Sequence, residues 1–594
     1  MADYNIADLP LEMLVEIFTY LTPSDRREAS LVSLQFFDAA QHPRFVNDRH
    51  LHFSYCELAE NVAPVSVFLQ STRAFHALTL SYFDCDKPID TFWEKIGKSV
   101  KYLEFNQFCD FGIYLPATLN RFTALETLKI DTDFDFGTQE CILPNLENLI
   151  LSFNIHGSYS NTNNHARHYE NLIKSMPKLK NIELIVYSGS YDALIQFLVI
   201  YPSKIKAITF QMLPDDSPAL VNTLKCIMKL RKIQLEKLCI TYFNNWLLLD
   251  EFLEKQPSLK HLELGTNVFP SREYPSIKKF EVSINKSVNS FESLKFLENL
   301  ENLIILGSYG ESNCFYGHKR IPCKSLIELQ LLDLKDRLCL SCFDAMLSSY
   351  PNLSNFYAYG TQLDNEHIKL LLLHAPKLRK MNILEHTQVT EEFICSTPSI
   401  TNLGLLEKLD LSGAFCLPNK ALLQWPKMIN LRDIGFGKIF DVNSDGMSKF
   451  LKQCPSIETF TIHETFRLTN DIIRLLFSNL SRLKHFRIYN EFEEQAVDRK
   501  DRPWLDLTKG CRELQSIRII DPNNKVDMKY ELFKRVPSLK VIYHAKHDLM
   551  TRASCFSIAN YVRLIGIPYS KLGKLQEIIE KYSDDEFEFG IVPM

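Results

Sequence analysis

Apolar residues recur along most of the chain in one short pattern. A leucine or similar residue is followed by a second apolar residue three positions later and a third two positions after that, as in Leu125, Leu128 and Ile130. The last two alternate with polar residues, which is typical of a strand with one buried face. The copies begin at Phe75, Val100, Leu125, Leu146, Leu179, Ile205, Leu235, Leu259, Ile277, Leu300, Leu326, Leu353, Leu378, Leu406, Leu431, Ile457, Leu483, Leu514 and Leu539. The pattern therefore predicts a strand in each of these segments.

Helical segments separate the predicted strands. Residues 365–373 and 470–477 carry apolar side chains at helical spacing, and each is followed by a break and the next strand. A unit of one strand and one helix cannot bury its own apolar face, so neighbouring units stack into a curved parallel sheet with helices outside. About 19 units of about 26 residues fall within the range of roughly 20 to 29 residues for leucine-rich repeats. The sequence therefore predicts the α/β class, with a leucine-rich-repeat solenoid over residues 54–548.

Three intervals between strands are long, and the chain continues past the last strand. The long intervals contain residues 156–164, 214–218 and 491–503, which are rich in turn-forming or charged residues and predict surface loops. Tolerated surface excursions are a commoner explanation of such loops than binding. Residues 575–582 predict a capping helix, and an acidic tail follows from Asp584, so that residues 549–594 form a C-terminal cap.

The N-terminal residues follow a different pattern. Residues 9–21 place apolar side chains at helical spacing and predict an amphipathic helix. Thr22 and Pro23 supply a cap and a first-turn proline for a second helix, which is expected to continue to Phe37. Two or three short helices have too little interior to bury all these apolar residues. The module therefore needs a partner for its apolar face, which is either the rest of this chain or a second protein.

The N-terminal segment resembles the F-box. Residues 9–21 read Leu-Pro-Leu-Glu-Met-Leu-Val-Glu-Ile-Phe-Thr-Tyr-Leu, and the resemblance extends to Phe37. Ser33 stands where the family usually has cysteine, and Phe36 where it usually has tryptophan. The resemblance implies a small all-α module over residues 1–53 that binds the Skp adaptor. The residues that it implies for this contact are Leu9, Pro10, Leu14, Ile17, Leu21, Leu31, Val32 and Phe36.

Module and repeats together resemble the F-box/leucine-rich-repeat protein family. The resemblance implies a substrate-recognition subunit of an SCF-type E3 ubiquitin ligase. The F-box then holds the Skp adaptor and, through it, the cullin and RING subunits, while the repeats hold a protein substrate for ubiquitination and proteasomal degradation. The chain itself needs no catalytic residues, because a separate conjugating enzyme carries the chemistry. The alternative is a non-degradative interaction scaffold that binds the adaptor.

Composition and charge limit the classes of partner that we expect for the chain. The chain has 594 residues, of which 46% are hydrophobic and 23% charged, so it can bury a large core. Its 67 Lys and Arg against 72 Asp and Glu give a net charge of -5, which provides no overall basic field for nucleic acid or an anionic membrane. The sequence has no secretion signal and no apolar stretch that approaches the roughly 18 residues of a membrane span. We therefore expect a soluble protein of the cytoplasm, the nucleus or both.

Candidate chemistry is sparse. The phosphate loop, the zinc-protease motif and the serine elbow do not occur, and no local motif singles out one of the 15 cysteines as a nucleophile. The one tight pair is Cys339 and Cys342, with Cys314, His318 and Cys323 upstream, but a second close pair is missing. Cysteines one helical turn apart in an apolar segment are usually core residues. We expect no enzymatic activity, no metal and no cofactor.

Outward-pointing strand residues are the candidates for holding a substrate. In each copy, the residues beside the second and third apolar positions point away from the core, and together they line a face suited to a protein partner. Aromatic and cationic residues gather among them in the C-terminal half, and Tyr and Arg are the usual hot-spot types. This set is Tyr357, Tyr359, His463, His485, Arg487, Tyr489 and Arg518. They predict a surface for an acidic or phosphorylated degron, although ordinary solvated strand residues explain them equally well.

Overall fold

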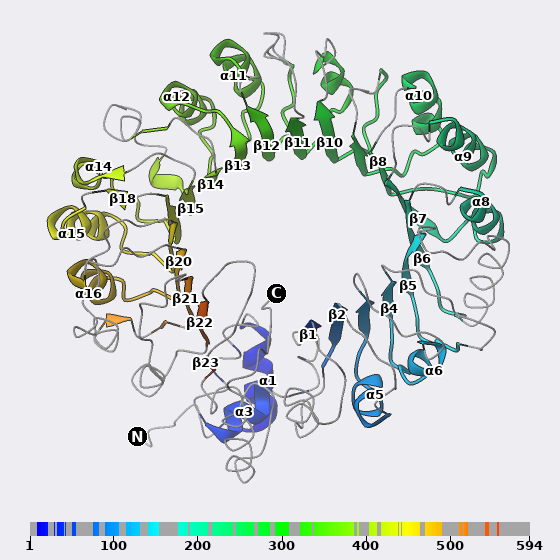
Figure 1. The fold of residues 1–594 in the computed structure, drawn as a ribbon, viewed down its shortest axis with the longest axis horizontal. Coiled ribbons are helices and arrows are strands. Elements are labelled where there is room, and N and C mark those ends of the chain that lie inside the picture. Colours follow the sequence, from blue (N-terminus) through cyan, green and yellow to red (C-terminus); the bar gives the residue numbers. More distant parts are fainter. Residues whose placement is uncertain are drawn as a thin grey trace. The chain divides into compact units, whose positions relative to one another are not determined.

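The computed structural model has two compact units, Met1–Ile208 with Ile558–Met594, and Thr209–Ser557. In each unit the strands of the repeats are parallel, and the helices that connect them lie on one side of the sheet (Figure 1). The residues that it describes are 9–21, 26, 29, 33–40, 42, 45, 50–54, 75–81, 90–105, 115–130, 141–153, 176–187, 191–211, 217–241, 245–265, 271–284, 291–307, 321–335, 338–384, 389–390, 403–412, 417–437, 439–440, 442–463, 470–489, 510–511, 513–514, 516–520, 541–545 and 555–556.

The first unit starts with two helices and continues with a parallel sheet. The helices are α1 (Leu11–Thr19) and α3 (Leu34–Ala40). The strands pair in chain order: β1 (His50–Ser54), β2 (Ala77–Ser81), β3 (Tyr102–Phe105), β4 (Thr127–Ile130), β5 (Asn148–Phe153) and β6 (Asn181–Tyr187). Connecting helices are α5 (Asp90–Gly97), α6 (Leu115–Leu119) and α8 (Tyr191–Ile200), and β7 (Ile205–Gln211) starts in this unit and ends in the second.

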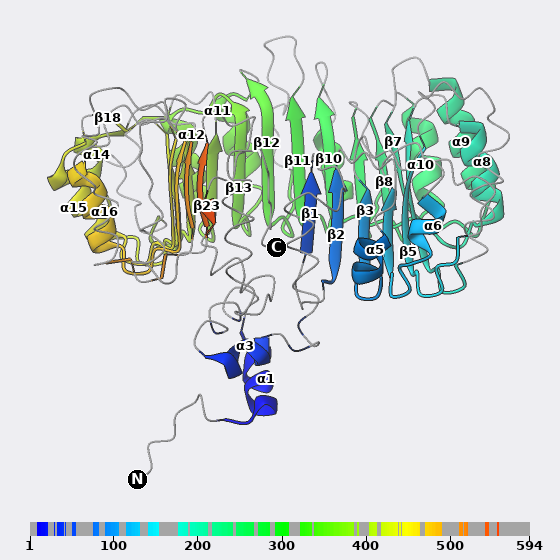
Figure 2. The ribbon, with the colours of Figure 1, turned by 60° about the horizontal axis from the view of Figure 1, so that its bottom comes forward.

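The second unit is a longer array of the same kind. Its strands are β8 (Lys237–Ile240), β9 (His261–Leu264), β10 (Lys279–Ile284), β11 (Asn302–Gly307), β12 (Glu328–Lys335), β13 (Asn355–Thr361), β14 (Lys380–Leu384), β15 (Lys408–Leu411), β17 (Asp433–Phe436), β19 (Thr459–His463), β20 (His485–Tyr489), β21 (Ser516–Ile520) and β22 (Val541–Ala545). Each pairs in parallel with the next, and β10 to β13 stand side by side in Figure 2. The short strand β23 (Cys555–Phe556) is antiparallel to β22, and β16 (Leu417–Pro418) pairs with β18 (Ile439–Phe440).

Helices connect the strands of the second unit. They are α9 (Ser217–Lys229), α10 (Trp246–Glu254), α11 (Leu340–Leu347), α12 (Asn365–His374), α14 (Asn419–Leu423), α15 (Ser444–Gln453) and α16 (Asn470–Asn479), with 3-10 turns at η5 (Phe291–Phe296) and η6 (Leu403–Leu405). The helices expected at 365–373 and 470–477 are therefore confirmed. In this unit the strands follow the inner side of an arc and the helices its outer side (Figure 1). The α/β solenoid expected from the repeat pattern is confirmed.

The predicted repeat positions coincide with the observed strands. Strands β2 to β22 of the main sheet begin two residues after the first apolar position of each copy, except β7, which begins at Ile205 itself. Within β9, for example, Leu262 and Leu264 are buried, while His261 and Glu263, which alternate with them, are half-buried on the other face. This alternation assigns one face of the sheet to the core beneath the helices and leaves the other, which we call the open face, for contact.

The structure places three segment boundaries differently from the sequence predictions. Strand β1 begins at His50 and pairs with β2, so the repeat sheet starts before the expected boundary between residues 53 and 54. The loop expected at 214–218 is shorter, because α9 begins at Ser217 with a proline in its first turn. The prediction of one second helix that continues to Phe37 was wrong, because Ser33 is not helical and α3 begins at Leu34. The expected loops at 156–164 and 491–503, the helix at 575–582 and the acidic tail lie outside the described residues.

Neighbouring repeats are held by contacts at the start of each strand. The backbone N–H groups of Glu126 and Thr127 both donate to the carbonyl oxygen of Lys101, at 2.8 Å. The Lys101 ammonium is also paired with the Glu126 carboxylate at 2.6 Å. Equivalent residues pair at other junctions, such as Lys278 with Glu301 at 2.7 Å. Exposed pairs of this kind contribute little each, about 0 to 1 kcal/mol, so core burial provides most of the stability.

Candidate docking surfaces

The core of the N-terminal module is formed by one face of α1. Leu14, Val15 and Phe18 are buried there and pack against Phe36 and other residues of α3. The rings of Phe18 and Phe36 meet edge to face with their centroids 5.5 Å apart. The aromatic residue at position 36 thus fills the module's interior, where the F-box pattern usually has the larger tryptophan.

A second apolar stripe runs along the other face of α1. Pro10, Met13, Ile17 and Tyr20 follow one another at helical spacing. Met13 is 53% exposed and Tyr20 83% exposed, while Pro10 is also exposed and Ile17 is half-buried against the core. Apolar side chains at the surface of so small a module are the expected signature of a docking surface. We call these four residues the α1 stripe.

The predicted adaptor-contact residues fall into three groups. Pro10 and Ile17 belong to the α1 stripe, and Leu9 and Leu21 are half-buried at the edge of the core. Leu14 and Phe36 lie inside the core, so they shape the module and do not present their side chains at its surface. Leu31 and Val32 lie outside the described residues. The sequence prediction missed Met13, Tyr20 and, on α3, Leu34, which is 82% exposed.

Polar contacts position the two helices. The Ser33 hydroxyl accepts a hydrogen bond from the backbone N–H of Phe36 at 3.2 Å, which caps the start of α3. The Gln35 side chain donates to the Leu9 carbonyl oxygen at 2.7 Å and ties α3 to the residues before α1. The Arg26 guanidinium donates to the carbonyl oxygens of Phe18 at 3.0 Å and Leu21 at 2.5 Å, which completes the end of α1. The serine at position 33 therefore has a structural role of its own.

Most of the predicted substrate residues lie on the open face of the second unit. Tyr357 on β13 and Arg487 on β20 stand in the same row of the sheet, five strands apart. At a spacing of about 4.8 Å between strands, they are separated by roughly 24 Å. Arg487 and Arg518 are register partners on neighbouring strands, and so are His463 and Tyr489. The structure therefore brings the C-terminal residues of the set together and leaves the two tyrosines of β13 as a separate group.

The side chains of this set differ in exposure. Tyr359 is 39% exposed, Arg487 is also exposed, and Tyr357 and His485 are half-buried. Burial and the nearby carboxylate of Glu328 raise the pKa of the Tyr357 hydroxyl, so it stays protonated and can donate a hydrogen bond. For His463, Tyr489 and Arg518 the structure describes only the position in the strand.

Asn382 is a candidate that the sequence prediction missed. It lies on the open face between the core residues Met381 and Ile383, and its register partners are Tyr357 and Asp410. The residue is only 7% exposed, yet its side-chain oxygen has no hydrogen-bond partner among the described residues. An unsatisfied acceptor of this kind is costly, so a bound donor would gain from meeting it. The sequence does not distinguish it, because most copies of the pattern place a polar residue between the two core positions.

A cluster of metal-ligand types lies on the open face nearer the start of the second unit. His261 and Glu263 of β9 and Glu281 of β10 each offer a ligand atom, and these atoms lie within 4.8 Å of one another. Burial and the ammonium groups of Lys279 and Lys237 lower the pKa of His261 to about 4. Burial and the carboxylate of Glu263 raise the pKa of Glu281. The imidazole is therefore neutral at neutral pH.

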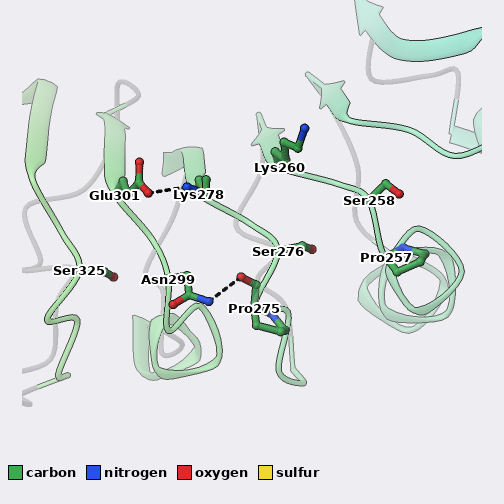
Figure 3. A pocket seen from close by; sticks show the side chains of 9 residues that line it. All are labelled: Pro257, Ser258, Lys260, Pro275, Ser276, Lys278, Asn299, Glu301 and Ser325. Carbon is green, nitrogen blue, oxygen red and sulfur yellow. Dashed lines mark hydrogen bonds and ion pairs between the residues drawn. The ribbon is translucent and has the colours of Figure 1, made fainter.

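A shallow pocket of about 470 Å³ lies where β9, β10 and β11 begin. Figure 3 shows its lining residues, which are Pro257, Ser258, Lys260, Pro275, Ser276, Lys278, Asn299, Glu301 and Ser325. The Asn299 amide donates to the Pro275 carbonyl oxygen at 2.9 Å, and the Lys278 ammonium pairs with Glu301 (Figure 3). These polar groups hold successive repeats together, so the pocket follows from repeat stacking and offers few groups to a ligand.

The described cysteines are mainly core residues. Cys141, Cys239, Cys323, Cys342, Cys454 and Cys511 are buried, and Cys226 and Cys339 are half-buried. Cys342 lies within α11 and Cys339 at its N-terminal cap. Burial raises the pKa of the Cys454 and Cys511 thiols to about 12, so they are poor nucleophiles. The expected core placement is confirmed for the buried thiols, while Cys314 and His318 lie outside the described residues.

Within the part of the chain that the structure describes, no helix has the length and apolar character needed to cross a bilayer.

Comparison with known proteins identifies the N-terminal module. The F-box-like family matches residues 6–52, which include α1 and α3. The N-terminal module is F-box-like. No curated protein matches the chain. Among solved structures, TLR13 in complex with ssRNA13 is 13% identical with a TM-score of 0.33, and the match covers 79% of this chain and 70% of that one. An internalin from Listeria monocytogenes is 14% identical with a TM-score of 0.33, covering 55% of this chain and 82% of that one.

The F-box-like module and the repeat sheet together define the chain's architecture. Its described parts combine an adaptor-binding type of module with a leucine-rich-repeat fold, which is an architecture typical of non-catalytic proteins. The family match spans 47 of the 594 residues, so it assigns the N-terminal module alone. The function of the repeats must be inferred from their surfaces.

Proposed function

We propose that the chain is the substrate-recognition subunit of an SCF-type E3 ubiquitin ligase. The observation that carries this proposal is the α1 stripe, an exposed apolar surface on an F-box-like module. Met13 and Tyr20 alone leave large apolar areas in water, and a partner that covers them gains about 25 cal/mol for each Å² that it buries. The proposed partner is the Skp adaptor, which links the chain to the cullin and RING subunits.

The adaptor surface consists of the stripe and its surroundings. Pro10, Met13, Ile17 and Tyr20 form its centre, and Leu34 on α3 adds a further exposed apolar side chain. The stripe is backed by the packed core of Leu14, Val15 and Phe18, so its side chains stand on a rigid helix. A preformed surface binds more tightly than one that must be ordered on contact, because less conformational entropy is lost.

The open face of the second unit is the proposed substrate surface. Arg487 and Arg518 occupy neighbouring positions in one row, flanked in register by Thr461 and Tyr543, which carry no charge at neutral pH. Two cationic residues side by side, with an uncharged residue on each flank, favour an acidic or phosphorylated segment of a substrate protein. Tyr357 and Asn382, farther along the same row, supply a hydroxyl donor and an unsatisfied amide oxygen.

In this proposal the chain acts by proximity. Holding the adaptor at one place and the substrate at another makes ubiquitin transfer effectively local, with the chemistry supplied by the conjugating enzyme on the RING subunit. The buried thiols with raised pKa fit this division of labour, since a ubiquitin-carrying cysteine must reach the surface as a reactive thiolate. Ubiquitination then leads to proteasomal degradation of the substrate.

A non-degradative scaffold is the second candidate. Such a protein would bind the adaptor through the same α1 stripe, so adaptor binding alone does not separate the two functions. Cullin in the same complex, and a protein that accumulates when the chain is depleted, are expected only of the ligase subunit.

The deciding experiment compares the wild-type chain with the Ile17→Asp variant in cells with the proteasome inhibited. The variant places a carboxylate on the α1 stripe and is expected to lose the adaptor and the cullin while keeping its substrates. Proximity labelling should then enrich the same proteins around both chains, with ubiquitination only around the wild type. Cullin that copurifies equally with both chains contradicts the proposal.

A further inference from the structure

We propose that His261, Glu263 and Glu281 form a binding site for a divalent transition metal of the zinc type on the open face of the second unit. The three residues are half-buried, and their ligand atoms lie within 4.8 Å of one another. The sequence pattern alone does not indicate this site, because its members come from two different strands.

The backbone fixes the arrangement. His261 and Glu263 lie two residues apart on β9, separated by the buried Leu262, so their side chains point to the same face. Glu281 is the register partner of Glu263 on the neighbouring strand β10. The three ligands thus come from adjacent positions of a parallel sheet, which is a rigid support for a metal site.

Two features of the cluster are costly without a cation. Carboxylates directly opposite each other on neighbouring strands repel, and the ion pair between the Lys279 ammonium and the Glu281 carboxylate is long, at 4.0 Å. The Nε2 atom of His261 is buried and has no hydrogen-bond partner among the described residues. A metal ion between these groups would neutralise the two carboxylates and give the imidazole a partner.

The ligand types indicate which metal fits. One imidazole nitrogen and two carboxylates are three protein ligands for zinc, which leaves the fourth position for water or another ligand. Calcium needs about six to eight oxygen ligands, more than this cluster offers. Zinc bonds of about 2.0 to 2.2 Å place tetrahedral ligand atoms roughly 3.3 Å apart. Rotation of the flexible glutamate side chains can bring the ligand atoms from within 4.8 Å to this distance.

Lysine neighbours are the competing explanation. Lys237 and Lys279 are the register partners of His261, and their ammonium groups lower its pKa. If these lysines alone balance the carboxylates, zinc gains nothing by binding. Both lysines have flexible four-carbon stems and can turn toward solvent, so that a metal ion can replace their ammonium groups beside the carboxylates.

The test is a zinc titration of the full-length protein after a chelator has removed bound metal. Isothermal titration should show one zinc ion per chain. Glu263→Gln and Glu281→Gln, which keep the side-chain shape, should each weaken binding by more than about 100-fold, since losing even an outer-shell partner typically costs about 10- to 100-fold. The matched control is Glu328→Gln, a half-buried carboxylate on β12, which should bind zinc as the wild type does.

A second control separates this site from the cysteines. The Cys339→Ser/Cys342→Ser variant should keep its zinc affinity, and the cobalt-loaded protein should lack the thiolate-to-metal charge-transfer band. Thermal melting of each variant checks that it is folded, and if one of the two glutamine variants unfolds, the other carries the test. Zinc that fails to bind the wild type at one per chain, binds both glutamine variants equally well, or is lost in the cysteine variant overturns the proposal.

Discussion

Replacing Met13 with aspartate tests the proposed adaptor surface most sharply. The Met13 side chain is 53% exposed on the α1 stripe, next in sequence to the buried Leu14 but on the other side of the helix. The substitution should therefore leave the module's core intact. It places a carboxylate at the centre of the surface that the adaptor would cover.

The expected loss of affinity has two parts. Burying a whole methionine side chain is worth about 1.5 to 3 kcal/mol, so covering the exposed half of Met13 contributes about 1 kcal/mol. Desolvating a new, unpaired carboxylate adds at least about 2 kcal/mol. A total of about 3 kcal/mol corresponds to roughly 100-fold weaker binding, since each 1.4 kcal/mol is a factor of ten.

The assay is a titration of the purified adaptor with the purified chain. The matched control is Leu373→Asp, which places the same charge at a leucine that is 62% exposed on α12 of the repeats. The control should bind the adaptor as the wild type does, and thermal melting should show both variants folded. A Met13→Asp variant that is folded and binds within about threefold of the wild type would refute the assignment of the α1 stripe.

Three further predictions concern the repeats. The Arg487→Glu/Arg518→Glu variant should lose substrates found by proximity labelling while keeping the adaptor; substrates retained at unchanged affinity would direct attention to residues 154–168 and 491–503. Gly265→Ala should lower the free energy of unfolding by about 2 kcal/mol or more in a denaturant titration, because an added Cβ would overlap the backbone carbonyl of Thr241. Asp250→Ala should cost about 2 to 3 kcal/mol in the same titration, because the buried Asp250 carboxylate accepts a hydrogen bond from the Ser271 N–H at 3.0 Å. An unchanged midpoint would contradict either stability prediction.

The repeat fold could be predicted from the sequence because one periodic signal determines it. Leucines such as Leu259, Leu262 and Leu264 mark the core positions of each strand, and stacking requires every repeat to place them alike. The strand β1 escaped prediction because its segment stands before the first clear copy of the pattern. The start of α3 was not predicted, because apolar residues at helical spacing continue through Ser33. Only the capping hydrogen bond of Ser33 shows where the helix begins.

The docking surfaces were only partly predictable, for two different reasons. Helical spacing shows that α1 is apolar on more than one side, but it does not say which side the module's own core will use. The resemblance to the F-box implies Leu14 as an adaptor contact, although its side chain is buried, and does not include Met13, whose side chain is exposed. The zinc-type cluster depends on register, since Glu263 and Glu281 become neighbours only when β9 and β10 pair. A sequence does not state that register directly.

The measurement that tests the central proposal most directly is a reconstituted ubiquitination assay. A substrate captured by proximity labelling is incubated with the adaptor, the cullin and RING subunits, the conjugating enzyme and either the wild-type chain or Met13→Asp. The proposal predicts that the substrate is ubiquitinated with the wild-type chain, and that the variant binds the substrate equally but supports little transfer. A substrate that binds the wild-type chain within the assembled complex and is not ubiquitinated contradicts the ligase function and favours the scaffold.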